Sequence, residues 1–94
     1  LGFTVTDLDA NVRGQLQLDS STEGVVVNKI KDSSNAYERG LRRGDVITTV
    51  KNKKVETSSE FYDELEELQK KGEEVVLLKI IRNNGNQFIA FELK

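Results

Sequence analysis

The segment that most constrains the fold of this chain is Gly40–Ile47, which reads Gly-Leu-Arg-Arg-Gly-Asp-Val-Ile. Gly40 follows the short helical stretch Ala36–Arg39, and it suits a residue with positive φ that ends a helix. Gly44 and Asp45 then predict a turn that leads directly into the β-branched strand Val46–Val50. A helix, its stop and a strand in close succession occur in many folds, so the flanking segments decide the architecture.

Length and charge indicate a small globular domain. We expect residues 1–94 to form a single domain with one modest core, taken from a longer protein. Hydrophobic residues make up 36% and charged residues 32% of the chain, which is typical of a folded domain. The net charge of −2 argues against a nucleic-acid partner. No apolar run approaches the roughly 20 residues that span a bilayer.

The residue types that are missing argue against catalysis. The chain has no histidine and no cysteine, so it lacks the commonest general base and cannot form a Ser/His or Cys/His pair. A Ser/Lys pair remains, but serine and lysine are frequent enough here to match by chance. The acidic residues of segment 63–67 fit the solvated face of an amphipathic helix, at i,i+4 spacing from Lys70 and Lys71. We therefore predict no catalytic residue, no metal and no cofactor in the isolated chain.

Hydrophobic periodicity predicts a mainly β fold with short helices. Strands are expected over 1–6, 24–30, 46–50, 74–82 and 87–93, and helices over 10–16, 36–39 and 58–71. The longest helix has a capping box formed by Thr57 and Glu60. Asn84-Gly85 predicts a type I′ turn between the last two strands. About six strands with two or three helices indicate an α+β, partly open antiparallel barrel or sandwich with helical caps.

Four segments in this order resemble a PDZ domain, in particular the type carried by HtrA/Deg (high-temperature-requirement) serine proteases. They are the opening Leu1–Val5 (Leu-Gly-Phe-Thr-Val), the strand Gly24–Val27 (Gly-Val-Val-Val), the block Gly40–Ile47 and the helix that begins near Ser58. The resemblance covers nearly the whole chain, although the prolines usual in and near the Gly40–Ile47 block are absent. It implies the PDZ fold, and the final strand is compatible with a C-terminal second PDZ domain.

The candidate binding site is a sheet edge that a peptide could join as an added strand. A terminal carboxylate needs converging backbone N–H groups, and Gly2, between two large apolar residues, lets them converge. The resemblance implies that the amides of Leu1, Gly2 and Phe3 hold this carboxylate and that Phe3, Thr4 and Val5 pair with the peptide. It places the groove and its pocket at Leu1, Phe3, Val5, Ser58, Phe61, Tyr62 and Leu65. On pattern alone, the apolar members of this set are better explained as hydrophobic core.

The function that these observations predict is peptide binding. The domain would capture hydrophobic C-terminal peptides or unfolded protein segments for an HtrA/Deg-type protease whose catalytic domain is separate. One alternative is an assembly or regulatory domain with a vestigial groove, which docks on a neighbouring protease or PDZ domain through residues such as Arg42 and Arg43. Another is the PDZ domain of a different envelope protease or secretion protein. The resemblance implies the bacterial periplasm or cell envelope, whereas the sequence alone indicates no location.

Overall fold

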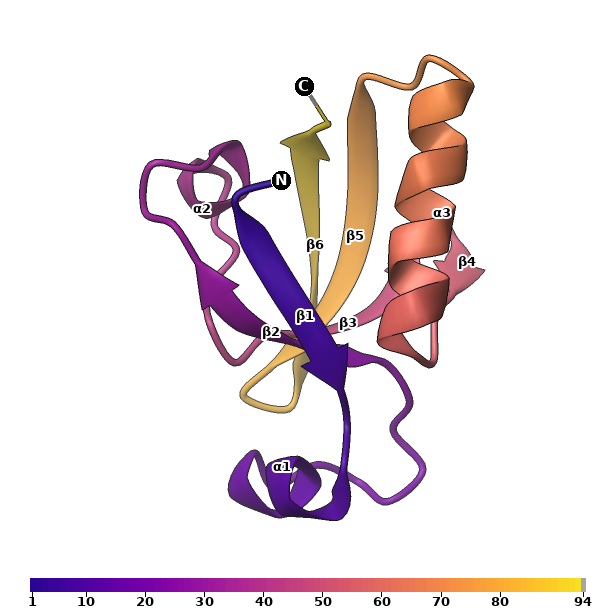
Figure 1. Cartoon of the computed structure of the whole chain (residues 1–94). Helices are drawn as coiled ribbons and strands as arrows, with labels where there is room; N and C mark the ends of the chain where they lie inside the picture. Colours follow the sequence, from indigo (N-terminus) through magenta and orange to yellow (C-terminus); the bar gives the residue numbers. More distant parts are fainter. Residues whose placement is uncertain (94) are drawn as a thin grey trace.

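The structure is a computed structural model that describes residues 1–93, over which the chain forms six strands and three helices. The strands are β1 (Phe3–Asp7), β2 (Val25–Ile30), β3 (Val46–Val50), β4 (Lys53–Lys54), β5 (Val75–Arg82) and β6 (Gly85–Glu92). The helices are α1 (Ala10–Gln15), α2 (Asn35–Glu38) and α3 (Ser58–Lys70). The predicted mainly β architecture of about six strands and three helices is confirmed (Figure 1).

The strands form one antiparallel sheet in the order β1-β2-β3-β5-β6, and the short β4 pairs with β3. β1 therefore lies at an edge of the sheet, and α3 runs beside it (Figure 1). The first strand begins two residues later than predicted, at Phe3, and Leu1 is exposed. Among the helices of residues 1–93, none is both long and apolar enough to cross a membrane.

One hydrophobic core joins the sheet to α3. Successive side chains of a strand point to opposite faces, and on β5 the alternate residues Val76, Leu78 and Ile80 are fully buried. The predicted apolar face of α3 is confirmed, because its buried residues are Phe61, Leu65 and Leu68. This face packs against the sheet, where α3 contacts β1 and β3.

Local sequence signals account for most helix ends. Thr57 accepts a hydrogen bond from the backbone N–H of Glu60, and the Glu60 carboxylate accepts one from the backbone N–H of Thr57, so the predicted capping box is confirmed. Gly40 follows α2 with φ of +112°, as predicted for a helix stop. The turn at Gly44 leads into β3 as expected.

Two turns differ from the prediction. The β5–β6 hairpin turns at Asn83 and Asn84, which have φ of 52° and 62°, whereas Gly85 already belongs to β6 and pairs with Arg82. The predicted turn at Asn84-Gly85 is therefore wrong by one residue, because asparagine tolerates the left-handed region well enough to occupy both positions. The turn between β3 and α3, where no strand was predicted, includes the short strand β4.

A buried ion pair fixes the Gly40–Asp45 turn to the end of β5. The Asp45 side chain is 3% exposed and accepts hydrogen bonds from Arg82 Nε (2.8 Å), Arg82 Nη2 (2.5 Å) and the Arg42 backbone N (2.8 Å). Arg82 Nη2 also donates to the Gly40 carbonyl at 2.7 Å. The hydrogen bond to Asp45 raises the pKa of the Arg82 guanidinium further above its usual range. Arg82 was not singled out by the sequence.

Candidate functional site

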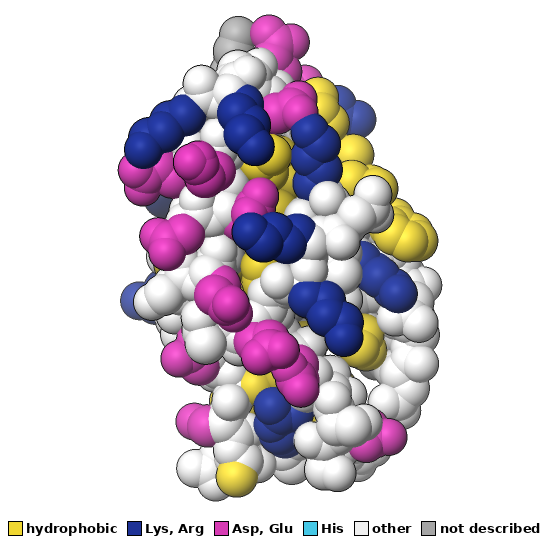
Figure 2. Space-filling view, turned by 90° about the vertical axis from the view of Figure 1, so that its right-hand side faces the viewer, with side chains coloured by type: hydrophobic (Ala, Val, Ile, Leu, Met, Phe, Trp, Pro, Cys, Tyr) yellow, Lys and Arg dark blue, Asp and Glu magenta, His cyan; other side chains and the backbone are white. Residues whose placement is uncertain are grey.

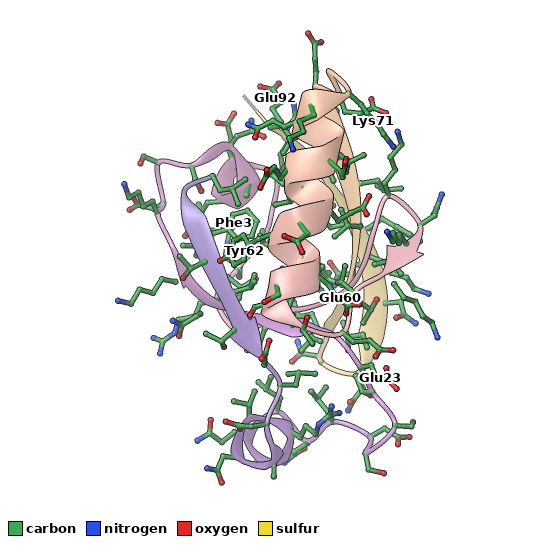
Figure 3. All side chains as sticks on the ribbon, turned by 45° about the vertical axis from the view of Figure 1, so that its right-hand side comes forward. Phe3, Glu23, Glu60, Tyr62, Lys71 and Glu92 are labelled. Carbon is green, nitrogen blue, oxygen red and sulfur yellow. The ribbon has the colours of Figure 1, made fainter. Side chains whose placement is uncertain are left out.

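The free edge of β1 faces α3. On its other side β1 pairs with β2, where the Gly2 carbonyl accepts a hydrogen bond from the backbone N of Lys31 at 2.8 Å. The backbone N–H of Val5 points away from β2 and donates to the hydroxyl of Tyr62 on α3, at 3.0 Å. Figure 3 shows Phe3 and Tyr62 in this space between strand and helix. The backbone groups that an added strand would use lie here.

Apolar side chains from both elements pack together where the sequence predicts the groove. Phe3, Val5 and Leu65 are each 5% exposed, and Phe61 is fully buried. The Phe3 ring lies 6.0 Å from the Phe61 ring and 5.6 Å from the Phe91 ring, between centroids. The structure thus brings together four of the apolar residues assigned to the groove, Phe3, Val5, Phe61 and Leu65, and it also places them in the core cluster. Core packing alone explains their burial, so their contact with a ligand stays a prediction.

Gly2 lies just before β1, where the predicted groove would end. Gly2 has φ of +86°, and a Cβ built there would lie 2.5 Å from the Cβ of Ser34. Ser34 is the N-cap of α2, so the loop before β1 rests directly on that helix. Both the backbone conformation and this close approach require glycine. Leu1, predicted to help wall the pocket, is 52% exposed, and Thr4 lies exposed in β1.

Two hydrogen bonds cross from β1 to α3. Tyr62 and Val5 form the first, and the second joins the backbone N–H of Ser58 to Asp7 Oδ1 at 2.6 Å. Asp7 therefore satisfies one of the free N–H groups in the first turn of α3. Tyr62 and Ser58 are among the residues predicted for the groove, whereas neither hydrogen bond, nor a place for Asp7 in the site, was predicted. The partners are 57 and 51 residues apart, and no local motif indicates such a contact.

The outer face of α3 is charged and solvated. Acidic and basic side chains are interspersed over the face that carries α3 and β4 (Figure 2). Glu64 lies 3.0 Å from the ammonium of Lys53, and Glu66 lies 3.3 Å from Lys70, which confirms the predicted i,i+4 spacing. Within residues 1–93, no group of three or more acidic side chains is arranged to hold a metal ion.

A pair of carboxyl groups lies outside the groove. A hydrogen bond that the protonated carboxyl of Glu56 donates to Glu23 raises the pKa of Glu56 above its usual 4.5, and the negative charge of Glu23 adds to the effect. Figure 3 shows Glu23 well away from Phe3 and Tyr62. Both residues are exposed, so water reaches the pair.

Two similar proteins bear the name "Probable periplasmic serine endoprotease DegP-like". The one from Bartonella henselae is 39% identical over 70 residues, which are 74% of this chain and 14% of the relative. The one from Pseudomonas putida is 34% identical over 93 residues, which are 99% of this chain and 18% of the relative. This chain therefore spans less than a fifth of the length of either relative.

Two solved structures share the fold. The HtrA3 PDZ domain bound to a phage-derived ligand (FGRWV) has a TM-score of 0.76 at 22% identity, with 98% of this chain and 81% of that chain covered. The HtrA-type protease AlgW with a decapeptide has a TM-score of 0.73 at 21% identity, with 98% and 27% covered. The family model described as PDZ domain matches residues 1–93. The predicted resemblance is confirmed, and the chain belongs to the PDZ domain family.

Proposed function

We propose that this chain is the peptide-binding module of an HtrA/Deg-type serine protease and that it captures hydrophobic C-termini by β-strand addition. The observation that carries the proposal is that β1 is an edge strand whose Val5 N–H points toward α3, and whose apolar side chains share one core cluster with Phe61 and Leu65 of that helix. An extended peptide laid along such an edge gains main-chain hydrogen bonds, and pockets for alternate side chains give selectivity. The two solved structures of similar fold, one bound to a phage-derived ligand and one with a decapeptide, support this assignment.

The end of the peptide would lie at Gly2. The positive φ of Gly2 lets the amides of Leu1, Gly2 and Phe3 converge on a carboxylate. The carboxylate can then be bound without a lysine or arginine side chain. The final side chain would enter between Val5 and Leu65, where the surroundings are apolar. This arrangement favours a free carboxylate after a hydrophobic residue.

In this proposal the chain performs no catalysis and needs no cofactor. The relatives are named serine endoproteases, and the module would hold substrates for a catalytic domain elsewhere in the protein. Their names also place them in the periplasm, which we propose as the location of this domain.

A specific observation favours a second function, in which the domain docks on a neighbouring protease or PDZ domain. The groove residues Phe3, Val5 and Leu65 are almost fully buried, and the Val5 N–H already has a partner in Tyr62. A groove closed in this way suits a vestigial site. Arg43 and the exposed guanidinium of Arg42, which stacks 3.7 Å above the Tyr37 ring, would then belong to the docking surface.

An amide NMR titration separates these functions. The probe is a short peptide with a hydrophobic last residue and a free C-terminus, and the matched control is the same peptide amidated. Peptide binding predicts shifts at Gly2, Phe3 and Val5, with a Kd in the micromolar range or weaker, or about −8 kcal/mol at best, because the peptide loses conformational freedom. Amidation should weaken binding by removing the charged acceptor. Shifts confined to Arg42 and Arg43, or none at millimolar peptide, would favour docking.

A further inference from the structure

The hydroxyl of Tyr62 occupies a position that a bound peptide needs. In an antiparallel edge strand, alternate residues present their N–H and C=O groups to the open side. Because Gly2 bonds toward β2 and Val5 donates toward α3, the outward groups of β1 are those of Phe3 and Val5. A strand added beside β1 would place a carbonyl oxygen on the Val5 N–H. The Tyr62 oxygen accepts that hydrogen bond at 3.0 Å.

The helix itself is held in place while this contact forms. The bond between Ser58 N–H and Asp7 ties the first turn of α3 to the end of β1. Phe61 packs against Phe3 in the core, and the Tyr62 ring meets the Phe61 ring edge-on at 5.3 Å and 78°. Tyr62 itself is 38% exposed. Rotation of this side chain into solvent therefore frees the Val5 N–H without separation of α3 from β1.

We propose that Tyr62 is an affinity-determining residue that competes, within the molecule, with the peptide backbone for the Val5 N–H. This inference rests on the proposed function. A ligand must supply a replacement acceptor, so only extended peptides that reach Val5 displace Tyr62. Peptides that end at Gly2 and contact Phe3 alone leave the contact intact. A protein that populates a closed state binds with an affinity reduced by the fraction that is open.

The test compares Tyr62→Phe with Tyr37→Phe as the matched control, since each change removes one phenol hydroxyl and keeps the ring. Calorimetry with a peptide that has a free hydrophobic C-terminus should give a Kd about fivefold lower for Tyr62→Phe, which corresponds to about 1 kcal/mol, the usual net value of one hydrogen bond. Tyr37→Phe should bind like the unmodified domain. An equal or higher Kd for Tyr62→Phe overturns the proposal, and a higher one would mean that the hydroxyl contacts the ligand.

Hydrogen exchange in the absence of peptide tests the contact independently. Tyr62→Phe should accelerate exchange of the Val5 amide about fivefold and leave the β1 amides that bond to β2 unchanged. Unaltered exchange at Val5 overturns the proposal whatever the peptide does. If exchange at Val5 accelerates but neither form binds peptide, Tyr62 caps the strand edge at a site that binds no peptide. That result overturns the proposed function, and the competition with it.

Discussion

Replacing Arg82 with leucine removes the charged partner of the buried Asp45 carboxylate and puts an apolar side chain of moderate size in its place. Asp45 is 3% exposed, and two of its three hydrogen bonds come from Arg82. After the change, Asp45 keeps only the bond from the Arg42 backbone N–H, and the Gly40 carbonyl loses its bond to Arg82. The turn between α2 and β3 then holds an unpaired buried charge.

Arg82→Leu should lower the free energy of unfolding by about 3 kcal/mol. Removing one partner of a buried ion pair typically costs about 3–5 kcal/mol, because the other charge stays buried without compensation. The Arg82 side chain is 30% exposed, so water can enter the vacated space, and we take the low end of that range. The total free energy of unfolding of a domain of this size is roughly 5–14 kcal/mol. At about 4–8 °C per kcal/mol, the melting temperature should fall by about 12–24 °C.

Urea denaturation measures this change as a lower midpoint with an unchanged m-value. The matched control is Lys53→Gln, which breaks the 3.0 Å ion pair between Lys53 and Glu64. This pair serves as the surface comparison because the Lys53 side chain is 70% exposed. That surface pair should be worth less than about 1 kcal/mol. The double variant Asp45→Asn/Arg82→Leu should recover part of the loss, since no buried charge remains. If Arg82→Leu costs no more than Lys53→Gln, the inference that this ion pair holds the turn is wrong.

Three further outcomes follow from the backbone and the surface charges. Gly40→Ala should cost about 1 kcal/mol in urea denaturation from strain alone, since its φ is +112° and no atom lies within 4 Å of the added Cβ. Gly2→Ala should lower the free energy of unfolding further than Gly40→Ala, because its Cβ would meet Ser34. Adding Ser34→Gly should restore part of the difference, and equal losses at the two glycines would contradict this explanation. Glu23→Gln should lower the pKa of Glu56 toward 4.5 in a carboxyl NMR titration, because the Glu23 hydrogen bond raises that pKa. Because the pKa of Glu56 is raised in the native state, its destabilising effect on the fold appears as pH rises above the unfolded value of 4.5 and is absent below it.

The parts of the fold that the sequence predicts are those with a local cause. A threonine and a glutamate three residues apart form the capping box that starts α3. Gly40 ends α2 because glycine readily adopts the positive φ found there. The hairpin turn shows the limit of such signals. Asn83, Asn84 and Gly85 all tolerate positive φ, so the pattern fixes the existence of the turn but not its register.

The features that the sequence did not predict depend on contacts between residues far apart in the chain, which no local motif indicates. Arg82 lies 37 residues from Asp45, and Tyr62 lies 57 residues from Val5. An arginine after an apolar strand or a tyrosine on a polar helix face is ordinary in any protein. Only the pairing of β3 with β5 brings Arg82 to Asp45, and only the packing of α3 beside β1 brings the Tyr62 hydroxyl to the strand edge.

The same packing determines which residues can separate binding from folding. Phe3 contacts both Phe61 and Phe91, so it belongs to the core and to the base of the groove at once. A substitution at Phe3 would remove core contacts worth several kcal/mol, and lost binding would then follow from lost structure. Tyr62 is different, because it is 38% exposed and its hydroxyl oxygen bonds to β1. The groove can therefore be altered at the hydroxyl of Tyr62 while the aromatic core that supports it stays intact.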